Sequence, residues 1–260
     1  MPNPHDLTGK KAFVTGGKRR IGRGIALALA ESGCDVGVND LHHDEDGDET
    51  LESIRQMGRE AEFFAGDISD STVVNGMFDA FLDRFGRIDI LVNNPYGGTG
   101  AHFLELTEEN WDANLDIGLK GFYLCSQRAA KEMVKQGDGG AICSTSSVHG
   151  RRAWKTDTAY GCAKAGVIRL TESMAVDLGE HGIRCNAVLP GHMNTNHIFN
   201  TPAPEVGSIQ EDLYESVPLR RRGTPEDIGR AVAFLCSPAA DCISGVSLPV
   251  EGGLLACSRQ

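Results

Sequence analysis

Short apolar runs alternate with longer amphipathic stretches along almost the whole chain. The short runs predict buried strands, at Ala12–Thr15, Val36–Asn39, Glu62–Ala65, Ile88–Asn93, Ala141–Ser144, Arg184–Val188 and Gly245–Val250. The longer stretches predict helices, at Ile21–Ser32, Gly47–Met57, Ser71–Phe85, Trp111–Lys135, Tyr160–Glu180 and Pro225–Leu235. This alternation predicts an α/β fold with one doubly wound parallel sheet and helices on both faces. Ligands in such sheets bind beyond the carboxyl ends of the strands.

A glycine-rich turn connects the first predicted strand to the first predicted helix. It reads Thr15-Gly16-Gly17-Lys18-Arg19-Arg20-Ile21-Gly22. Glycines let the backbone approach a pyrophosphate closely, and the following helix N-terminus offers N–H groups and positive dipole potential. The position between a strand and a helix favours a dinucleotide-binding turn over an ordinary glycine-rich turn.

Three residues in the second half of the chain indicate proton transfer at an alcohol or a carbonyl. Tyr160 and Lys164 lie one turn apart on the same face of a predicted helix, and Ser147 precedes them. An ammonium beside a phenol stabilises the phenolate, so we expect Lys164 to lower the pKa of Tyr160 from its usual value of about 10. The tyrosine can then exchange a proton with the substrate, whose oxygen Ser147 is expected to hold.

Together these motifs resemble the short-chain dehydrogenase/reductase family. The resemblance runs from about Leu7 to Gly253 and includes three further motifs in the family's order, Asp67-Ile68, Asn93-Asn94 and Pro190-Gly191…Thr195. It implies a Rossmann-type single domain, residues 1–260, that interconverts a CH–OH group and a carbonyl with a nicotinamide cofactor. By the same resemblance Tyr160 is the general acid or base, Lys164 also binds the nicotinamide ribose, and Ser147 orients the substrate.

The resemblance also implies a set of cofactor-binding residues. They are Gly16, Gly17, Lys18, Arg19, Arg20, Ile21, Gly22, Asp40, Leu41, Asp67, Ile68, Asn94, Tyr160, Lys164, Pro190, Gly191, Met193 and Thr195. Asp40 ends the second predicted strand, where an acid accepts from the adenine ribose hydroxyls and repels a 2′-phosphate, so we expect NAD. Basic residues in the glycine turn often mark NADP preference in the family. Lys18, Arg19 and Arg20 therefore leave NADP use open.

Three positions depart from the family pattern. Arg20 replaces a glycine of the turn, and Pro95-Tyr96 follow the Asn-Asn motif in place of alanine and glycine. Gly118 stands where the family has an asparagine that helps to hold a water for proton relay. We hypothesise that Asn114, one helical turn earlier, or a water in the space left by Gly118 completes the relay. The alternative is that Asn114 is a surface or capping residue.

Composition and charge argue against a nucleic-acid-binding, a membrane-spanning or a metal-binding protein. A net charge of -11 over 260 residues argues against a nucleic-acid partner. No apolar stretch approaches the roughly twenty residues that span a bilayer, and Met1–Asp6 lack a signal segment, so we expect a cytoplasmic protein. The eight cysteines form no Cys-x-x-Cys pair, and we expect them to be reduced. His42-His43 lack further ligands at a typical spacing, so we expect no metal.

Side chains around the catalytic set indicate a hydroxylated substrate. The stretch Val148–Thr158 is rich in polar and cationic residues, and residues 192–218 are expected to form a substrate lid. The candidate substrate-binding residues are Tyr96, His149, Arg152, Trp154, His192 and His197. We predict oxidation of a sugar or polyol, with Arg152 gripping the anion of an acidic sugar. The alternative is that Arg151 and Arg152 face solvent or another subunit.

Two other functions stay open on the sequence. A 3-oxoacyl carrier-protein reductase shares the motifs, and Arg220-Arg221-Arg222 is its candidate docking patch. A non-catalytic dinucleotide-binding sensor or scaffold would account for the departures, but it has no need of proton-transfer residues. The apolar, glycine-rich tail Gly245–Leu255 resembles the family segment at subunit contacts, which implies a homotetramer.

Overall fold

The apolar runs of the sequence form one seven-stranded parallel sheet with the order β3-β2-β1-β4-β5-β6-β7. The computed structural model describes residues 3–195 and 216–257. The strands are β1 Lys11–Val14, β2 Asp35–Asp40, β3 Ala61–Ala65, β4 Ile90–Asn93, β5 Gly140–Thr145, β6 Ile183–Pro190 and β7 Ser247–Val250. The strand order reverses direction between β1 and β4, which creates a crevice at their carboxyl ends.

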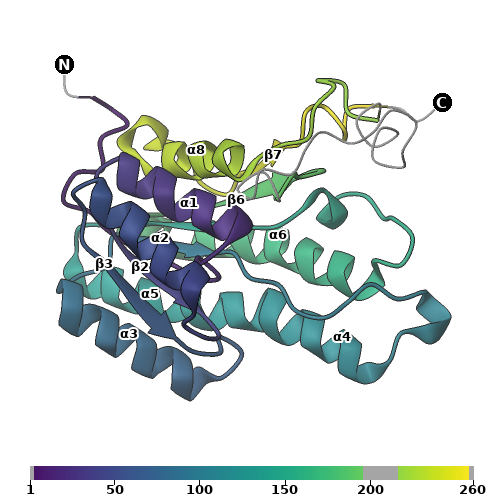
Figure 1. Cartoon of the computed structure of the whole chain (residues 1–260), viewed down its shortest axis with the longest axis horizontal. Helices are drawn as coiled ribbons and strands as arrows, with labels where there is room; N and C mark the ends of the chain where they lie inside the picture. The colour runs from purple at the N-terminus through teal and green to yellow at the C-terminus, as the bar shows by residue number, and fades with distance from the viewer. Residues whose placement is uncertain (1–2, 196–215, 258–260) are drawn as a thin grey trace.

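Helices cover both faces of the sheet (Figure 1). They are α1 Arg20–Glu31, α2 Glu45–Gln56, α3 Ser71–Phe85, α4 Glu108–Leu115, α5 Gly121–Gln136, α6 Thr158–Leu178 and α8 Pro225–Cys236. Successive strand residues point to opposite faces. Ala12 and Val14 therefore pack with α1, α2 and α8, whereas Phe13 packs with α3 and α5 in a second core. This confirms the predicted doubly wound sheet. Among the described residues, no helix combines the length and apolar character needed to cross a bilayer.

Helices α1 and α8, which are far apart in the sequence, pack closely together at glycine residues. A Cβ on Gly229 of α8 would lie 2.3 Å from the carbonyl oxygen of Gly24 in α1. A Cβ on Gly24 would lie 2.5 Å from the backbone of Pro225. Side chains at either position would separate the helices, so the glycines hold α1, whose N-terminus follows the glycine turn, directly against α8.

The long helix predicted at Trp111–Lys135 differs from the observed structure. It begins at Glu108, where the Thr107 side chain accepts a hydrogen bond from the N–H of Asn110, and Asp116–Lys120 forms a π-helical segment between α4 and α5. The prediction took the whole stretch as one regular α-helix and did not identify the π-helical segment. Gly118, the position of the missing family asparagine, lies inside this segment.

The cysteines are free thiols, and those of the core are buried. Burial raises the pKa of Cys125 to about 12, so its thiol stays protonated at neutral pH. Cys162, between Tyr160 and Lys164 in sequence, is exposed to solvent.

Candidate active site

A cavity of about 490 Å³ opens beyond the carboxyl ends of the central strands. It is lined by Gly16, Arg19, Arg20, Ile21, Asp40, Asn94, Pro95, Tyr96, Gly97, Gly98, Thr145, Ser146, Ser147, Tyr160, Lys164, Pro190, Gly191, Met193 and Thr195. The three predicted catalytic residues and most of the predicted cofactor-binding residues therefore share one cavity. The strand order brings them together, because parallel strands end on the same edge of the sheet.

Lys164 is the most deeply buried ionisable group of this cavity, with 2% of its surface exposed. Its Nζ donates a hydrogen bond to the carbonyl oxygen of Thr145 over 2.8 Å and lies 4.9 Å from the centre of the Phe122 ring. The same atom lies 5.7 Å from the centre of the Tyr160 ring, as expected for residues one turn apart in α6. Burial lowers the pKa of Lys164 to about 7.

The expected fall in the pKa of Tyr160 does not occur in this structure. Burial raises the pKa of Tyr160, and a hydrogen bond with Ser147 only partly opposes that rise, while the nearby Tyr96 and Asp157 add to it. Lys164 fails to reverse the shift because its own pKa is near 7, so the lysine carries only part of its charge at neutral pH. The prediction missed the burial of Lys164 and the partial burial of Tyr160, which depend on the packing of α6 against the sheet.

Two adjacent serines have different roles at the end of β5. Ser146 is buried and its Oγ donates to the carbonyl oxygen of Lys164 over 2.7 Å, which ties α6 to the sheet. Ser147 reaches Tyr160, and its Oγ accepts from the N–H of His149 over 3.2 Å. The contacts therefore favour Ser147 over Ser146 as the serine that holds the substrate, because Ser146 is bound to the backbone of α6.

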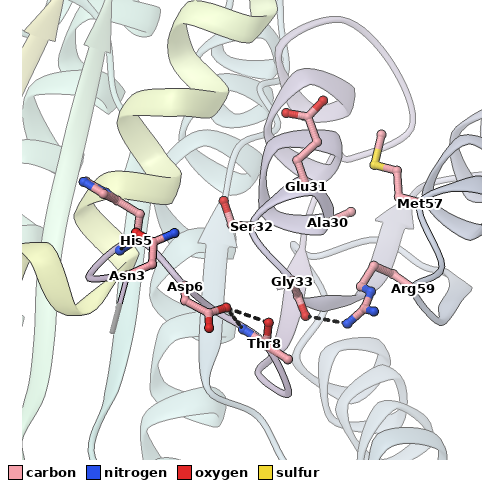
Figure 2. A pocket seen from close by; sticks show the side chains of 10 residues that line it. All are labelled: Asn3, His5, Asp6, Thr8, Ala30, Glu31, Ser32, Gly33, Met57 and Arg59. Carbon is pink, nitrogen blue, oxygen red and sulfur yellow. Dashed lines mark hydrogen bonds between the residues drawn. The ribbon is translucent and has the colours of Figure 1, made fainter. Parts of the chain in front are cut away.

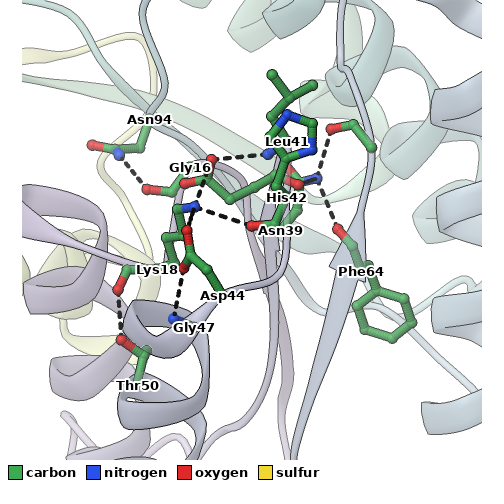
Figure 3. Close-up of polar contacts among 12 residues, drawn as sticks. Gly16, Lys18, Asn39, Leu41, His42, Asp44, Gly47, Thr50, Phe64 and Asn94 are labelled. Atoms are coloured by element: carbon green, nitrogen blue, oxygen red, sulfur yellow. Dashed lines mark hydrogen bonds and ion pairs between the residues drawn. The ribbon is translucent and has the colours of Figure 1, made fainter.

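The glycine turn is closely packed around Gly16 and Gly22. Gly16 has a φ of +60°, and a Cβ on Gly22 would lie 1.9 Å from the Gly16 carbonyl oxygen. Asn94 donates to that same oxygen over 2.9 Å (Figure 3). Arg20, which replaces a family glycine, has a left-handed backbone with a φ of +52°, at a cost of about 1 kcal/mol. This is a conformation that glycine adopts without strain.

This turn fits the phosphates of a dinucleotide. The residue before α1, Arg19, makes no side-chain capping bond, so the first N–H groups of the helix have no side-chain partner there. Anions bind at such helix ends. Arg19 and Arg20 are exposed and line the same cavity. The side chains and backbone groups of the turn therefore match the charge of a pyrophosphate.

Lys18 lies away from the cavity, although it belongs to the predicted cofactor set. Its Nζ is 2.6 Å from an Asp44 carboxylate oxygen and 3.0 Å from the His42 carbonyl oxygen, as Figure 3 shows. The Lys18 ammonium holds the pKa of Asp44 below its usual value. Asp40, at the end of β2, lines the cavity and lies 4.0 Å from the same ammonium. The nearest cation to Asp40 is therefore already paired with another carboxylate.

Several other predicted cofactor residues lie outside the cavity lining. Gly17 and Gly22 shape the turn, Leu41 is exposed, Ile68 packs in the core, and Asp67 accepts from the N–H of Ser69 over 2.8 Å. The glycines act through their backbone. For Leu41, Asp67 and Ile68, the resemblance identified a segment of the chain, but their side chains do not line this cavity.

Asn114, the residue hypothesised to complete the proton relay, is a buried polar residue that packs against Gly98 and not against Gly118. Asn114 is 2% exposed, and its amide nitrogen donates to the Asn110 carbonyl oxygen over 2.8 Å. Asn110 in turn binds both backbone groups of Thr99 over 2.8 Å each. The alternative of a surface residue is wrong, because Asn114 is buried beneath the loop that lines the cavity. Its part in a proton relay stays a prediction.

The predicted substrate residues are divided between the cavity and other sites. Tyr96 lines the cavity, with its ring centre 6.3 Å from that of Tyr160. His149 lies edge-to-face with Tyr160 at 5.4 Å and stacks on Trp154 at 4.3 Å. Arg152 instead donates to the Cys257 carbonyl oxygen over 3.2 Å. One N–H of the Arg152 guanidinium thus binds the C-terminal segment in this structure, and an anion grip by Arg152 stays a prediction.

Two short parts of the predicted lid, residues 192–195 and 216–218, are among the described residues. His192 is at the edge of the cavity, between Gly191 and Met193, and its carbonyl oxygen accepts from the N–H of Gly223 over 3.0 Å. His197 and residues 196–215 of the predicted lid 192–218 lie outside the described residues.

Sequence reasoning missed Asp157 as a residue of this site. Its carboxylate contacts His149 over 2.9 Å and raises the pKa of Tyr160. An acid three residues before the catalytic tyrosine was the available signal, but acids at helix starts are common for a different reason, the helix dipole.

A second cavity, of about 420 Å³, lies at the opposite end of the strands (Figure 2). Two of its ionisable side chains are bound to neighbouring residues: Asp6 accepts from Thr8, and Arg59 donates to the Gly33 carbonyl oxygen over 3.2 Å. None of the predicted site residues lines this cavity.

Known proteins are similar to this chain in sequence and in fold over nearly its full length. A family model described as enoyl-(acyl carrier protein) reductase matches residues 16–255. The 2-dehydro-3-deoxy-D-gluconate 5-dehydrogenase of Escherichia coli K12 is 35% identical over 251 residues, covering 96% of this chain and 97% of that protein. A solved short-chain type dehydrogenase/reductase from Mycobacterium marinum has a TM-score of 0.88 at 32% identity, covering 98% of each chain. An NAD⁺-bound xylitol dehydrogenase also has a TM-score of 0.88, at 30% identity, covering 95% of this chain and 99% of that one. The chain therefore belongs to the short-chain dehydrogenase/reductase family, whose members are oxidoreductases acting on CH–OH groups.

Proposed function

We propose that this protein is an NAD-dependent dehydrogenase that oxidises a secondary hydroxyl or hemiacetal of a neutral sugar or polyol. One observation carries the proposal: Ser147, Tyr160 and Lys164 line the same cavity as Asp40 and the N-terminus of α1. The carbonyl and the alcohol interconvert through one hydride and one proton. A bound nicotinamide supplies the hydride carrier, and the protein supplies the proton path.

The three catalytic residues divide the work at the substrate oxygen. Ser147 donates to that oxygen and holds it near the phenol of Tyr160. Tyr160 takes the hydroxyl proton during oxidation and returns it during reduction. Lys164, bound to the end of β5 through Thr145, fixes α6 and places a partly charged ammonium behind the tyrosine. Lys164 and Tyr160 are among the residues that would hold a nicotinamide cofactor, and its positive charge would favour the phenolate that the reaction requires.

The charges around Asp40 favour NAD. Asp40 Oδ1 accepts from the N–H of Leu41 over 2.8 Å, and this carboxylate lines the cavity. Lys18 lies 4.0 Å from Asp40 but pairs more closely with Asp44, over 2.6 Å, so two carboxylates share its single charge. A 2′-phosphate would therefore meet a carboxylate, whereas ribose hydroxyls can donate to it. Arg19 and Arg20 remain as exposed residues that attract either cofactor.

Two observations support a neutral sugar or polyol as substrate. Besides Ser147, the polar side chains of His149 and Asp157 lie near Tyr160, and both suit hydroxyl groups. The cation expected to grip a carboxylate, Arg152, is bound to the C-terminal segment. The similar proteins named above act on a sugar acid and on a polyol by their names, which supports polyhydroxylated substrates as a class.

The carrier-protein reductase is less well supported. Its docking patch requires accessible cations, but Arg221 binds Asp227 through 2.5 and 3.1 Å contacts, and this pairing lowers the pKa of Asp227 to about 2. Arg220 and Arg222 also have partners.

We also propose that the protein is a cytoplasmic homotetramer. A surface groove between α5 and α6 is lined mainly by apolar side chains, and Tyr123, Val134 and Val176 are exposed on these helices. The edge strand β7 offers a second, separate surface. Two different self-complementary surfaces produce a tetramer with dihedral symmetry. Light scattering should report four chains of 27.9 kDa, and Tyr123→Glu should reduce the assembly to pairs.

The experiment that tests the function is a cofactor and substrate panel. Reduced nicotinamide is measured with NAD and NADP separately, across neutral sugars, acidic sugars, polyols and simple secondary alcohols. We expect turnover with NAD and with neutral polyhydroxylated compounds. Turnover only with acyl thioesters in the reducing direction would contradict the proposal.

A further inference from the structure

A cluster of three residues lies against Tyr160 and has no part in the proposed proton path. His149 comes from the short turn after Ser147, Trp154 from the following loop, and Asp157 from the residue before α6. The imidazole stacks on the indole with ring centres 4.3 Å apart and an interplanar angle of 21°. It meets the Tyr160 ring at 76°, with 5.4 Å between centres. The imidazole is therefore held in place on two sides, beside the reacting phenol.

Asp157 determines which nitrogen of this imidazole carries the proton. The Oδ2 atom of Asp157 lies 2.9 Å from His149 Nδ1 and accepts from the N–H of Trp154 over 3.0 Å. The carboxylate can only accept, so the neutral imidazole carries its proton on Nδ1, an assignment made from this contact. Nε2 is then a hydrogen-bond acceptor. In the described parts of the chain, Nε2 has no hydrogen-bond partner.

The neighbourhood of His149 favours a hydroxyl over an anion. Arg152 is bound to the Cys257 carbonyl oxygen, and Arg151 is exposed. Asp157 adds a negative charge directly behind the ring, with 11% of its side chain exposed. A lone pair backed by a carboxylate repels a second carboxylate and accepts readily from an O–H. With 28% of its side chain exposed, His149 stays accessible to a substrate.

We propose that His149 Nε2 accepts a hydrogen bond from a substrate hydroxyl on the carbon next to the reacting one. The enzyme therefore selects vicinal diols and 2-hydroxy hemiacetals. This rests on the proposed function and specifies its substrate class. The position of His149 beside Tyr160 limits which substrate hydroxyl it can bind. A group in contact with the phenol ring reaches only substrate atoms close to the oxygen that loses its proton, so the hydroxyl lies on the adjacent carbon. His149 is a substrate-binding residue, and Asp157 is the positioning residue that orients it.

Matched pairs of substrates test this inference. The pairs are 2,3-butanediol with 2-butanol, and glucose with 2-deoxyglucose, where each second compound lacks the adjacent hydroxyl. In the wild type, kcat/KM for the hydroxylated member of the pair that turns over should exceed that of its partner by about tenfold or more. His149→Phe keeps the stacking on Trp154 but removes both nitrogens. It should abolish the preference, so that kcat/KM for the hydroxylated member falls to that of its partner.

Variants of Asp157 separate positioning from packing. Asp157→Asn keeps an oxygen that accepts from Nδ1, so the preference should stay within about threefold of wild type. Asp157→Ala should raise KM for the hydroxylated substrate more than it lowers kcat. Equal loss on both members of a pair in His149→Phe, or no preference in wild type, would overturn the inference and leave the dehydrogenase function intact. If the enzyme oxidises none of the four compounds and no sugar or polyol of the wider panel, the proposed function is overturned, and the inference with it.

Discussion

The side-chain nitrogen of Lys164 donates a hydrogen bond to the carbonyl oxygen of Thr145, 2.8 Å away at the end of β5. This bond joins the helix that carries Tyr160 to the strand that leads to Ser147. It also confines an ammonium within the protein, where burial lowers its pKa to about 7. The site is thus assembled at a cost in stability, a common feature of catalytic groups that must work near neutral pH.

The buried lysine predicts an unusual dependence of stability on pH. In the folded protein the pKa of Lys164 is about 7, below the usual value of 10.5. Between these two pH values the unfolded chain therefore binds more protons than the folded protein does. The free energy of unfolding should rise with pH over this range. Lys164→Met removes this contribution. The unfolding free energy of wild type relative to Lys164→Met should increase by about 2 to 3 kcal/mol from about pH 6 to about pH 9. Urea denaturation at the two pH values measures it. A constant difference would show that the lysine stays charged in the fold.

Removal of the phenol hydroxyl should stop the reaction without unfolding the site. Tyr160→Phe keeps the ring contacts with His149 and Tyr96 but loses the proton carrier. We expect kcat to fall by about 10²- to 10⁴-fold. Titration of cofactor against protein fluorescence should give a Kd within about threefold of wild type. Substantial residual turnover would assign the proton transfer to another group.

Asp40 should control the choice of cofactor, and Asp44 should support it. Asp40→Ala removes the acceptor for the ribose hydroxyls, so the ratio of kcat/KM for NAD to that for NADP should fall by about tenfold or more. Asp44→Asn releases Lys18, which can then pair with Asp40, so a smaller fall is expected. Steady-state kinetics with both cofactors measures the ratios. An NADP preference shared by wild type and Asp40→Ala would contradict the assignment.

Glycine positions in three helices should respond differently to alanine. Gly22→Ala places a methyl group 1.9 Å from the Gly16 carbonyl oxygen, so the turn must open, and the cofactor Kd should rise by about tenfold or more. Gly76→Ala in α3 meets no atom within 4 Å and is the control. Gly118→Ala meets only the Ala163 side chain, at 3.4 Å, and should be tolerated. Equal cofactor affinity in the Gly22 and Gly76 variants would argue against close packing of the turn.

Asn114 allows the relay hypothesis to be separated from a structural role. Its amide binds Asn110, which holds the backbone of Thr99 beside the cavity. Asn114→Ala should therefore destabilise the protein by about 1 to 2 kcal/mol and raise KM by loosening this loop. A changed pH–rate profile would support the relay. A profile that matches wild type, with only KM altered, would leave the loop anchor as its role.

Much of the fold could be predicted because the signals are local. The period of apolar residues separated strands from helices, and most predicted ends differ from the observed ones by one or two residues. The π-helical segment at Asp116–Lys120 escaped prediction, since the stretch was taken as one regular α-helix. Gly22 and Gly16 were recognisable because a tight strand-to-helix turn requires glycine wherever it lies.

The sequence by itself determined which chemistry is available, and the tertiary structure decided where each charge is used. Tyr160 and Lys164 share a face because four residues complete about one helical turn, a property of any helix. The partners of Lys18 and Arg152 were not predictable, because Asp44 is 26 residues away and Cys257 is 105 residues away. The pKa of Tyr160 rises for the same reason: burial depends on residues from distant parts of the chain that pack around the phenol. Local spacing reveals candidate groups, whereas desolvation and pairing exist only once the chain has folded.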